Sequence, residues 1–192
     1  MSVEQPARPV RDDSAGVTPA QFKQVFRHHP AGVAVVTLRS PEGPVGFTAT
    51  SVISVSADPP LLAFSLAATS SSRPAVEAAE SLVVNFLAAD QEEVARQFAR
   101  RGVDRFAGVR WCPLPTGEPV LHGTAAWLRA EVDARIPVGD SLLVTLRAVL
   151  AHQRERPVPL VYANRTYHPF PAVAGPVAAE GSPPTEDSPA EA

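Results

Sequence analysis

Alternating apolar and polar positions mark the second half of the chain. Between residues 125 and 138 every second side chain is apolar, and the intervening positions are mostly charged or aromatic. A period of two residues is typical of a β-strand with one face buried and one face in water. The same pattern returns at 141–153 after a Gly139–Asp140 turn, so the two segments predict a long hairpin.

Shorter apolar runs elsewhere predict further strands, bounded by Gly, Pro, Asp and Ser. They lie at 33–38, 45–56, 61–66, 81–87 and 160–170. Most of the links are too short for crossover helices, so neighbouring strands are expected to be antiparallel. Strands separated by turns, without regular alternation of strand and helix, predict a mainly β fold that closes into a barrel.

Two or three short helices accompany the strands. The first begins at Thr18, where Gln21 completes a capping box, and it places Phe22, Val25 and Phe26 on one face. A second is expected over 90–101 with Asp90 as its cap, and a short third from Pro74 onward. Because Arg73 precedes Pro74, its backbone is expected to be extended.

Composition limits the class of protein. The 192 residues suffice for one domain, expected at 18–170, with disordered tails at 1–17 and 171–192. A net charge of -3 gives no broad attraction to nucleic acid, and no run is long enough to span a membrane. The start has no apolar signal core, and the lone Cys112 excludes an internal disulfide framework. A cytoplasmic protein is expected.

The familiar catalytic signatures are absent from the sequence. There is no phosphate-binding glycine loop and no nucleophile elbow, and the five histidines lack the spacing of zinc ligands, so no metal is expected. The segment 46–74 is instead rich in Ser and Thr. Hydroxyls beside the Arg73 guanidinium could clamp a phosphate. The alternative is a solvent-exposed serine-rich loop.

Several motifs in order give this segment a context. They read "HHPAGVAVVTL", "GFTATSVISVSADPPLLAFSL", "SSSR", "VNFLAADQEEVARQFA" and "DRFAGVRW". Over residues 22–167 the chain resembles the flavin reductase-like family of FMN-binding split barrels. The resemblance implies a homodimer of six-stranded antiparallel barrels with Greek-key-like topology. It also implies reduction of FMN or FAD by NADH or NADPH, in most members to supply a partner monooxygenase.

The resemblance assigns site residues. Flavin-binding candidates are Thr48, Ala49, Thr50, Ser51, Ser65, Leu66, Ser70, Ser71, Ser72, Arg73, Arg105 and Phe106. Candidates for the nicotinamide are Pro30, Gly139, Asp140 and Ser141. No side chain is expected to act as catalyst, because hydride passes between the two cofactors.

One departure from the family leaves alternatives open. Many of its reductases carry Gly-Asp-His where this chain has Gly139-Asp140-Ser141. A serine cannot stack on a nicotinamide ring. The alternatives are therefore a flavin-binding protein without reductase activity, or a split barrel that uses another flavin-like cofactor.

Overall fold

The computed structural model describes residues 16–155 and 157–170. Apart from Gly16 and Val17, both predicted tails lie outside the described residues, so their disorder stays a prediction. The helices are α1 (Pro19–Arg27), α2 (Arg73–Ala78) and α3 (Glu92–Ala99). The strands are β1 (Ala31–Gly32), β2 (Ala34–Ser40), β3 (Gly43–Ala49), β4 (Ile53–Ser56), β5 (Leu61–Ala67), β6 (Ser81–Phe86), β7 (Trp111–Pro113), β8 (Pro119–Leu121), β9 (Ala126–Val138), β10 (Ser141–Gln153), β11 (Leu160–Ala163) and β12 (Thr166–Pro169).

The main sheet has the strand order β3-β2-β6-β9-β10-β5-β4, and every neighbouring pair is antiparallel. Its two end strands, β3 and β4, are consecutive in the chain and are separated only by a bend at residues 50–52. This bent stretch therefore pairs with β2 first and with β5 afterwards, which turns the open sheet into a barrel of six strands. The predicted antiparallel barrel is confirmed. The run expected as one strand at 45–56 forms two, β3 and β4, and the run at 160–170 forms β11 and β12 of a separate three-stranded sheet with β1.

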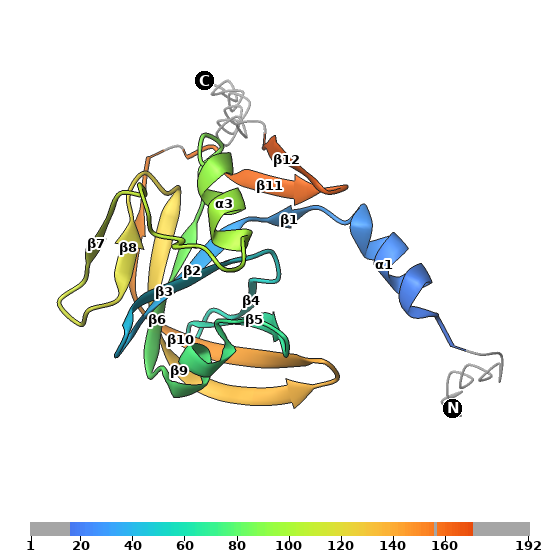
Figure 1. Ribbon diagram of the computed structural model, residues 1–192, viewed down its shortest axis with the longest axis horizontal. Coiled ribbons are helices and arrows are strands. Elements are labelled where there is room, and N and C mark those ends of the chain that lie inside the picture. Colours follow the sequence, from blue (N-terminus) through green and yellow to red (C-terminus); the bar gives the residue numbers. More distant parts are fainter. Residues whose placement is uncertain (1–15, 156, 171–192) are drawn as a thin grey trace, which may run out of the picture.

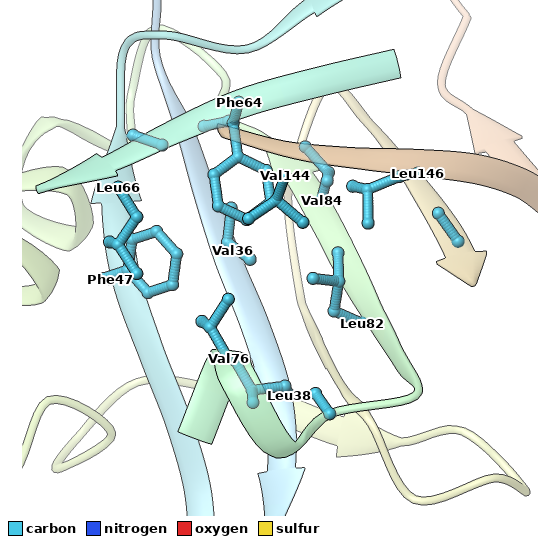
Figure 2. Close-up of a cluster of buried hydrophobic side chains, with 14 of the residues drawn as sticks. Val36, Leu38, Phe47, Phe64, Leu66, Val76, Leu82, Val84, Val144 and Leu146 are labelled. Atoms are coloured by element: carbon cyan, nitrogen blue, oxygen red, sulfur yellow. The ribbon is translucent and has the colours of Figure 1, made fainter. Parts of the chain in front are cut away.

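Aromatic and branched side chains fill the barrel (Figure 2). The rings of Phe47 and Phe64 lie 5.8 Å apart between centroids, and Val36 and Val84 are fully buried beside them. A second cluster lies under α3, where Phe98 packs edge-on against Phe106 with centroids 5.0 Å apart. Burial of each such side chain contributes about 1.5–3 kcal/mol, so the barrel and the α3 layer are both well anchored.

Buried polar groups fix the β7–β8 hairpin on the barrel. The Asn85 amide of β6 donates to Val35 O at 3.0 Å and accepts from the Leu121 N–H at 2.9 Å. Glu118 is ion-paired with Arg129 at 2.9 Å. Burial by itself would raise the pKa of Glu118, but hydrogen bonds from Ser81 and Thr116 outweigh it and lower the pKa. These groups serve the fold, since none of them lines the pockets described below.

Helix α1 behaves differently from the rest of the fold. Its capping box is confirmed, because Thr18 N donates to Gln21 Oε1 at 2.9 Å and Gln21 N to Thr18 Oγ1 at 3.3 Å. The helix projects away from the barrel in Figure 1, and Phe22, Val25 and Phe26 remain more than half exposed. No helix among the described residues is long and apolar enough to cross a membrane.

Three local expectations are wrong. Helix α3 begins after Gln91, whose side chain accepts from Ala88 N at 3.0 Å, and Asp90 provides no cap. Arg73 is the first residue of α2 and not extended. Ile136 is exposed, because the β9–β10 hairpin runs past the end of the barrel in Figure 1 and no other described element covers that face.

Candidate functional site

A pocket of about 420 Å³ opens between the end of β3, strand β5 and the end of α3. We call it the central pocket. Its wall is formed by Phe47, Thr48, Ala49, Thr50, Ser51, Ser65, Leu66, Ala67, Ser70, Ser71, Phe98, Ala99, Arg101 and Arg105. Nine of the twelve flavin-site candidates from the sequence are among them. Residues separated by as many as 58 positions, Phe47 and Arg105, are thus brought to one hollow.

Hydroxyls hold one end of the central pocket together. The Ser51 hydroxyl donates to Ser65 O and accepts from Ser65 N, both at 3.0 Å, where the bend after β3 has interrupted regular strand pairing. The Thr48 hydroxyl donates to Ala95 O at 2.6 Å and so ties β3 to α3. Among the described residues the hydroxyls of Thr50 and Ser65 have no hydrogen-bond partner. They remain available to a ligand.

Arg105 organises the other end. Its Nε donates to Arg100 O at 2.7 Å, and its Nη1 to Gly46 O at 2.8 Å and to the Ser72 hydroxyl at 3.0 Å. Its Nη2 makes only a long contact of 3.4 Å, to the Ser71 hydroxyl. A guanidinium has five N–H donors, so Nη2 keeps donor capacity toward the pocket.

The electrostatics of this end suit an anion. Arg101 lines the same pocket as Arg105, and no acidic residue in the described part of the chain does. Burial, followed by the charge of Arg101, lowers the pKa of Arg105. A bound anion would relieve that repulsion. Arg101 was not among the residues predicted from the sequence, although the basic pair at 100–101 just after α3 was a usable signal.

The other three flavin candidates do not line the central pocket. Ser72 is buried and accepts from Arg105. Phe106 belongs to the hydrophobic cluster under α3. The Nε of Arg73 donates to Glu77 at 2.8 Å, one turn further along α2. Arg105 therefore lines the pocket, whereas Arg73 is held by Glu77 on the surface of α2.

A second hollow of about 860 Å³, the helix pocket, adjoins the first. It shares Thr50, Ser51 and Ser65 with the central pocket. Its other wall residues are Phe22, Lys23, Phe26, Arg27, His29, Pro30, Ala31, Gly32, Val52, Ile53, Tyr162 and Arg165. Within the described residues this wall has basic side chains and no acidic ones. The two pockets thus meet at the hydroxyl end of the central pocket.

The nicotinamide candidates are divided between two places. Pro30 lines the helix pocket. Gly139, Asp140 and Ser141 form the β9–β10 turn and line neither pocket. That turn is nevertheless close to the site, because Ala68 N donates to Asp140 O at 2.8 Å and Ser141 pairs with Ala67 of the pocket wall.

The central pocket fits a flavin nucleotide. Its volume lies in the usual range for small-molecule sites, about 300–1,000 Å³. Neutral hydroxyls at one end match the polar edge of a flat ring, and two guanidiniums at the other match a phosphate.

Comparison with known proteins gives the family. The sequence model of the flavin reductase like domain matches residues 26–171. An NADH:FMN oxidoreductase from Rhodococcus qingshengii is 49% identical over 164 residues, which cover 82% of this chain and 85% of that protein. The reductase subunit of a flavin-dependent monooxygenase from Mycobacterium tuberculosis is 30% identical, and the match covers 80% of this chain and 83% of that protein.

A solved structure agrees with these relatives. The NADH:FAD oxidoreductase of Streptomyces globisporus, in complex with NAD and FAD fragments, superposes with a TM-score of 0.75 at 29% identity. The match covers 83% of this chain and 94% of that one. This chain belongs to the flavin reductase-like family, so the family and the split-barrel fold predicted from its motifs are confirmed.

Proposed function

We propose that this chain reduces flavin with NADH and that the central pocket holds the flavin. The enzyme class predicted from the sequence, an NAD(P)H-dependent flavin oxidoreductase, is confirmed by relatives of that activity over most of the chain. The observation that carries the assignment to this pocket is the meeting of two guanidiniums with hydroxyls that have no partner among the described residues, in a hollow that these residues line without an acidic side chain.

Each end of the pocket has its own task in this proposal. Thr50 and Ser65 present hydroxyls to the polar edge of the ring, while Ser51 keeps the bend and β5 at a fixed separation. Ser70, Ser71, Arg101 and Arg105 hold the phosphate, and Ser72 orients Arg105 from behind. Charge-assisted hydrogen bonds contribute about 1.5–3 kcal/mol each, so this end supplies most of the affinity for a phosphorylated flavin.

The chemistry requires positioning from the protein. A bound flavin supplies the hydride acceptor, so the chain needs no acid or base of its own. The helix pocket opens onto the hydroxyl end, where the ring lies, and we assign the nicotinamide dinucleotide to it. Lys23, Arg27 and Arg165 offer positive charge for its two phosphates. Fixing both rings at this junction is the chain's contribution to rate.

Oxidation of NADH and NADPH with FMN, FAD or riboflavin tests the proposal. We expect NADH to be oxidised at a rate that depends on added flavin. Ser141, in place of the family's histidine, favours one other candidate function, a flavin carrier without reductase activity. Flavin binding without turnover of either nucleotide would establish the carrier instead.

We further propose a homodimer. Phe22, Val25 and Phe26 of α1 expose a contiguous apolar face, and so do Ile136 and Val138 at the tip of the hairpin. Monomeric proteins rarely leave such faces in water, and a second copy would wall the open side of the helix pocket. Sedimentation at micromolar concentration should give a mass of twice the 20.3 kDa of one chain. The Phe22→Asp variant should sediment with the mass of a single chain. A wild-type monomer would contradict the dimer.

A role as the reductase component of a two-component monooxygenase completes the proposal. It is supported by the relative that serves as such a subunit. The exposed free thiol of Cys112 is compatible with a reducing compartment, and we propose the cytoplasm. Copurification of an oxygenase from the source cells, and its activity on mixing with this chain and NADH, test the partnership.

A further inference from the structure

A short turn between β5 and α2 carries the serines of the central pocket. We call residues 68–72 the serine turn. Ser70 and Ser71 line the pocket, and the Ser72 hydroxyl accepts from Arg105 Nη1 at 3.0 Å. Within the turn, Ser72 N donates to the Ser70 hydroxyl at 3.3 Å. This bond fixes the shape of the turn, whereas the place of the turn on the barrel depends on what holds its two ends.

The β9–β10 hairpin holds both ends of the serine turn. At the end that follows β5, Ala68 N donates to Asp140 O at 2.8 Å, in the tight turn of the hairpin. At the end that leads into α2, the Arg135 guanidinium of β9 donates from Nε to Val76 O at 3.0 Å and from Nη2 to Ala79 O. The serine turn therefore lies between two points that belong to one hairpin.

A β-bulge in β9 directs Arg135 toward α2. The two residues on either side of Asp133 pair with consecutive residues of β10, so Asp133 itself has no partner in the ladder. One extra residue in a strand exchanges the two faces for the side chains that follow it. Arg135 pairs with Val144, which is fully buried in the barrel, and paired side chains share a face. The bulge thus places the Arg135 side chain on the inner face, at the end of the barrel where α2 lies.

Arg135 supplies the C-terminal end of α2 with a cation that the helix lacks. The last carbonyls of a helix have no partners within it, and a positive charge beside them is favourable. The last turn of α2 contains no basic residue. No carboxylate of the described residues is ion-paired with Arg135. Val76 of α2 is fully buried among the side chains that fill the barrel (Figure 2). This burial fixes how deep the helix lies, and the hydrogen bonds from Arg135 fix its direction.

We propose that Arg135 is a positioning residue for the flavin phosphate. It holds α2, and the direction of α2 determines where Ser70 and Ser71 present their hydroxyls. Through Ser72 it also determines the place of the Arg105 guanidinium. This inference rests on the proposed function, because it takes the flavin phosphate to lie at these groups. Hydrogen bonds weaken steeply once their distance and angle depart from the optimum. Loss of Arg135 therefore weakens the hold on the phosphate and leaves the contacts to the ring, on β3 and β5, as they are.

The dissociation constants of FMN and riboflavin, measured by isothermal titration on the full chain, test this role. Arg135→Met keeps the length of the side chain and removes its donors. It should weaken FMN at least fivefold and riboflavin less than twofold. Arg135→Lys restores a cationic donor and should bring FMN to within twofold of the wild type. Equal losses for the two flavins in Arg135→Met, or no loss for either, would overturn the positioning role.

Arg147→Met is the matched control. Arg147 lies on β10 of the same hairpin, is exposed, pairs with Glu131 at 2.6 Å and lines neither pocket. The variant removes the same charge without a contact to α2, so both dissociation constants should stay within twofold of the wild type. A loss of FMN as large as that in Arg135→Met would assign the effect to net charge and overturn the positioning role. Should Arg135→Met not fold, Arg135→Gln decides by the same comparison, with an expected loss of about threefold for FMN alone.

NADH oxidation in the same samples separates this inference from the proposed function. Arg135→Met should raise the KM for FMN at least fivefold and keep kcat within twofold, because the contacts to the ring are unchanged. A preference for FMN over riboflavin that Arg135→Met leaves intact overturns the positioning role alone. Wild-type protein that binds riboflavin as tightly as FMN overturns the phosphate assignment and the positioning role with it. No turnover with any flavin, while Arg135→Met still weakens FMN selectively, overturns the reductase assignment and leaves the positioning role standing.

Discussion

The two ends of the central pocket are held together by different chemical groups. At the hydroxyl end, to which we assign the flavin ring and which we call the ring end, Ser51 and Thr48 use neutral hydroxyls to complete hydrogen bonds of the barrel and of α3. At the other end, to which we assign the flavin phosphate and which we call the phosphate end, the guanidinium of Arg105 connects a loop, a strand and the end of a helix. Substitutions at the ring end should therefore affect every flavin alike, whereas substitutions at the phosphate end should distinguish flavins by their phosphate.

The largest expected effect is at Arg105. Arg105→Ala should weaken FMN about 100-fold, because about two charge-assisted hydrogen bonds to the phosphate are lost. Riboflavin, which has no phosphate, should weaken less than tenfold, from loosening of the loop. Isothermal titration with both ligands measures the difference.

Arg73→Ala is the matched control for that experiment. Its guanidinium is paired with Glu77 and lies outside the pocket wall, so FMN should weaken less than threefold. A larger loss at Arg73 than at Arg105 would return the phosphate to the arginine that the sequence alone favoured. Equal losses of FMN and riboflavin at Arg105 would reduce that residue to a support of the fold.

The next largest effect is expected at Gly46, in β3. A Cβ on Gly46 would lie 2.5 Å from a ring carbon of Phe98, so Gly46→Ala forces α3 away from β3. Overpacking of this kind costs about 1–3 kcal/mol of the free energy of unfolding. Denaturant unfolding should show the loss, and adding Phe98→Leu should recover part of it.

Gly32→Ala provides the comparison for Gly46. No atom lies within 4 Å of the Cβ that the alanine would add at position 32. The free energy of unfolding of this variant should therefore stay within about 0.5 kcal/mol of the wild-type value. If both glycine variants were equally stable, the close approach of α3 to β3 would not be maintained in solution.

A smaller effect is expected at the ring end. Ser51→Ala leaves the N–H and the C=O of Ser65 without their partner, and FMN and riboflavin should both weaken about tenfold. Thr50→Ala removes a hydroxyl that has no partner in the described part of the chain, so it should leave the melting temperature unchanged. A Ser51→Ala loss confined to FMN would contradict the division of the pocket into two ends.

The extent to which sequence predicts this site follows the same division. The ring end lies on strands whose apolar alternation is visible locally, and the residues that the motif at 46–51 proposed for the flavin, Thr48 to Ser51, line it. The phosphate end depends on a contact between residues 33 positions apart, from Ser72 to Arg105. The sequence alone favoured Arg73, because it is adjacent to the serines. Only the packing of the loop after α3 shows which arginine reaches the pocket.

The same limit applies outside the pocket. The α1 capping box was predictable, because both of its residues lie within one turn of helix. The cap of α3 was not, since the Gln91 side chain donates to His122 O, 31 residues away, at 2.8 Å. The exposure of Ile136 likewise depends on where the barrel ends, and the alternation of β9 continues past that point without a break.

The smallest predicted effect concerns the turn that departs from the family. Ser141 lies directly opposite Ala67, and paired positions in an antiparallel ladder place their Cβ atoms about 4.5–5.5 Å apart on one face. Because Ala67 lines the central pocket, a larger ring at position 141 would reach its edge. Ser141→His should therefore lower the KM for NADH about threefold by stacking on the nicotinamide, and leave the dissociation constant of FMN unchanged. Ser141→Asn, which has no ring to stack, is the control and should leave the KM as it is. Steady-state rates over a range of NADH concentrations measure both, and an unchanged KM in the histidine variant would place the nicotinamide away from this turn, deeper in the helix pocket.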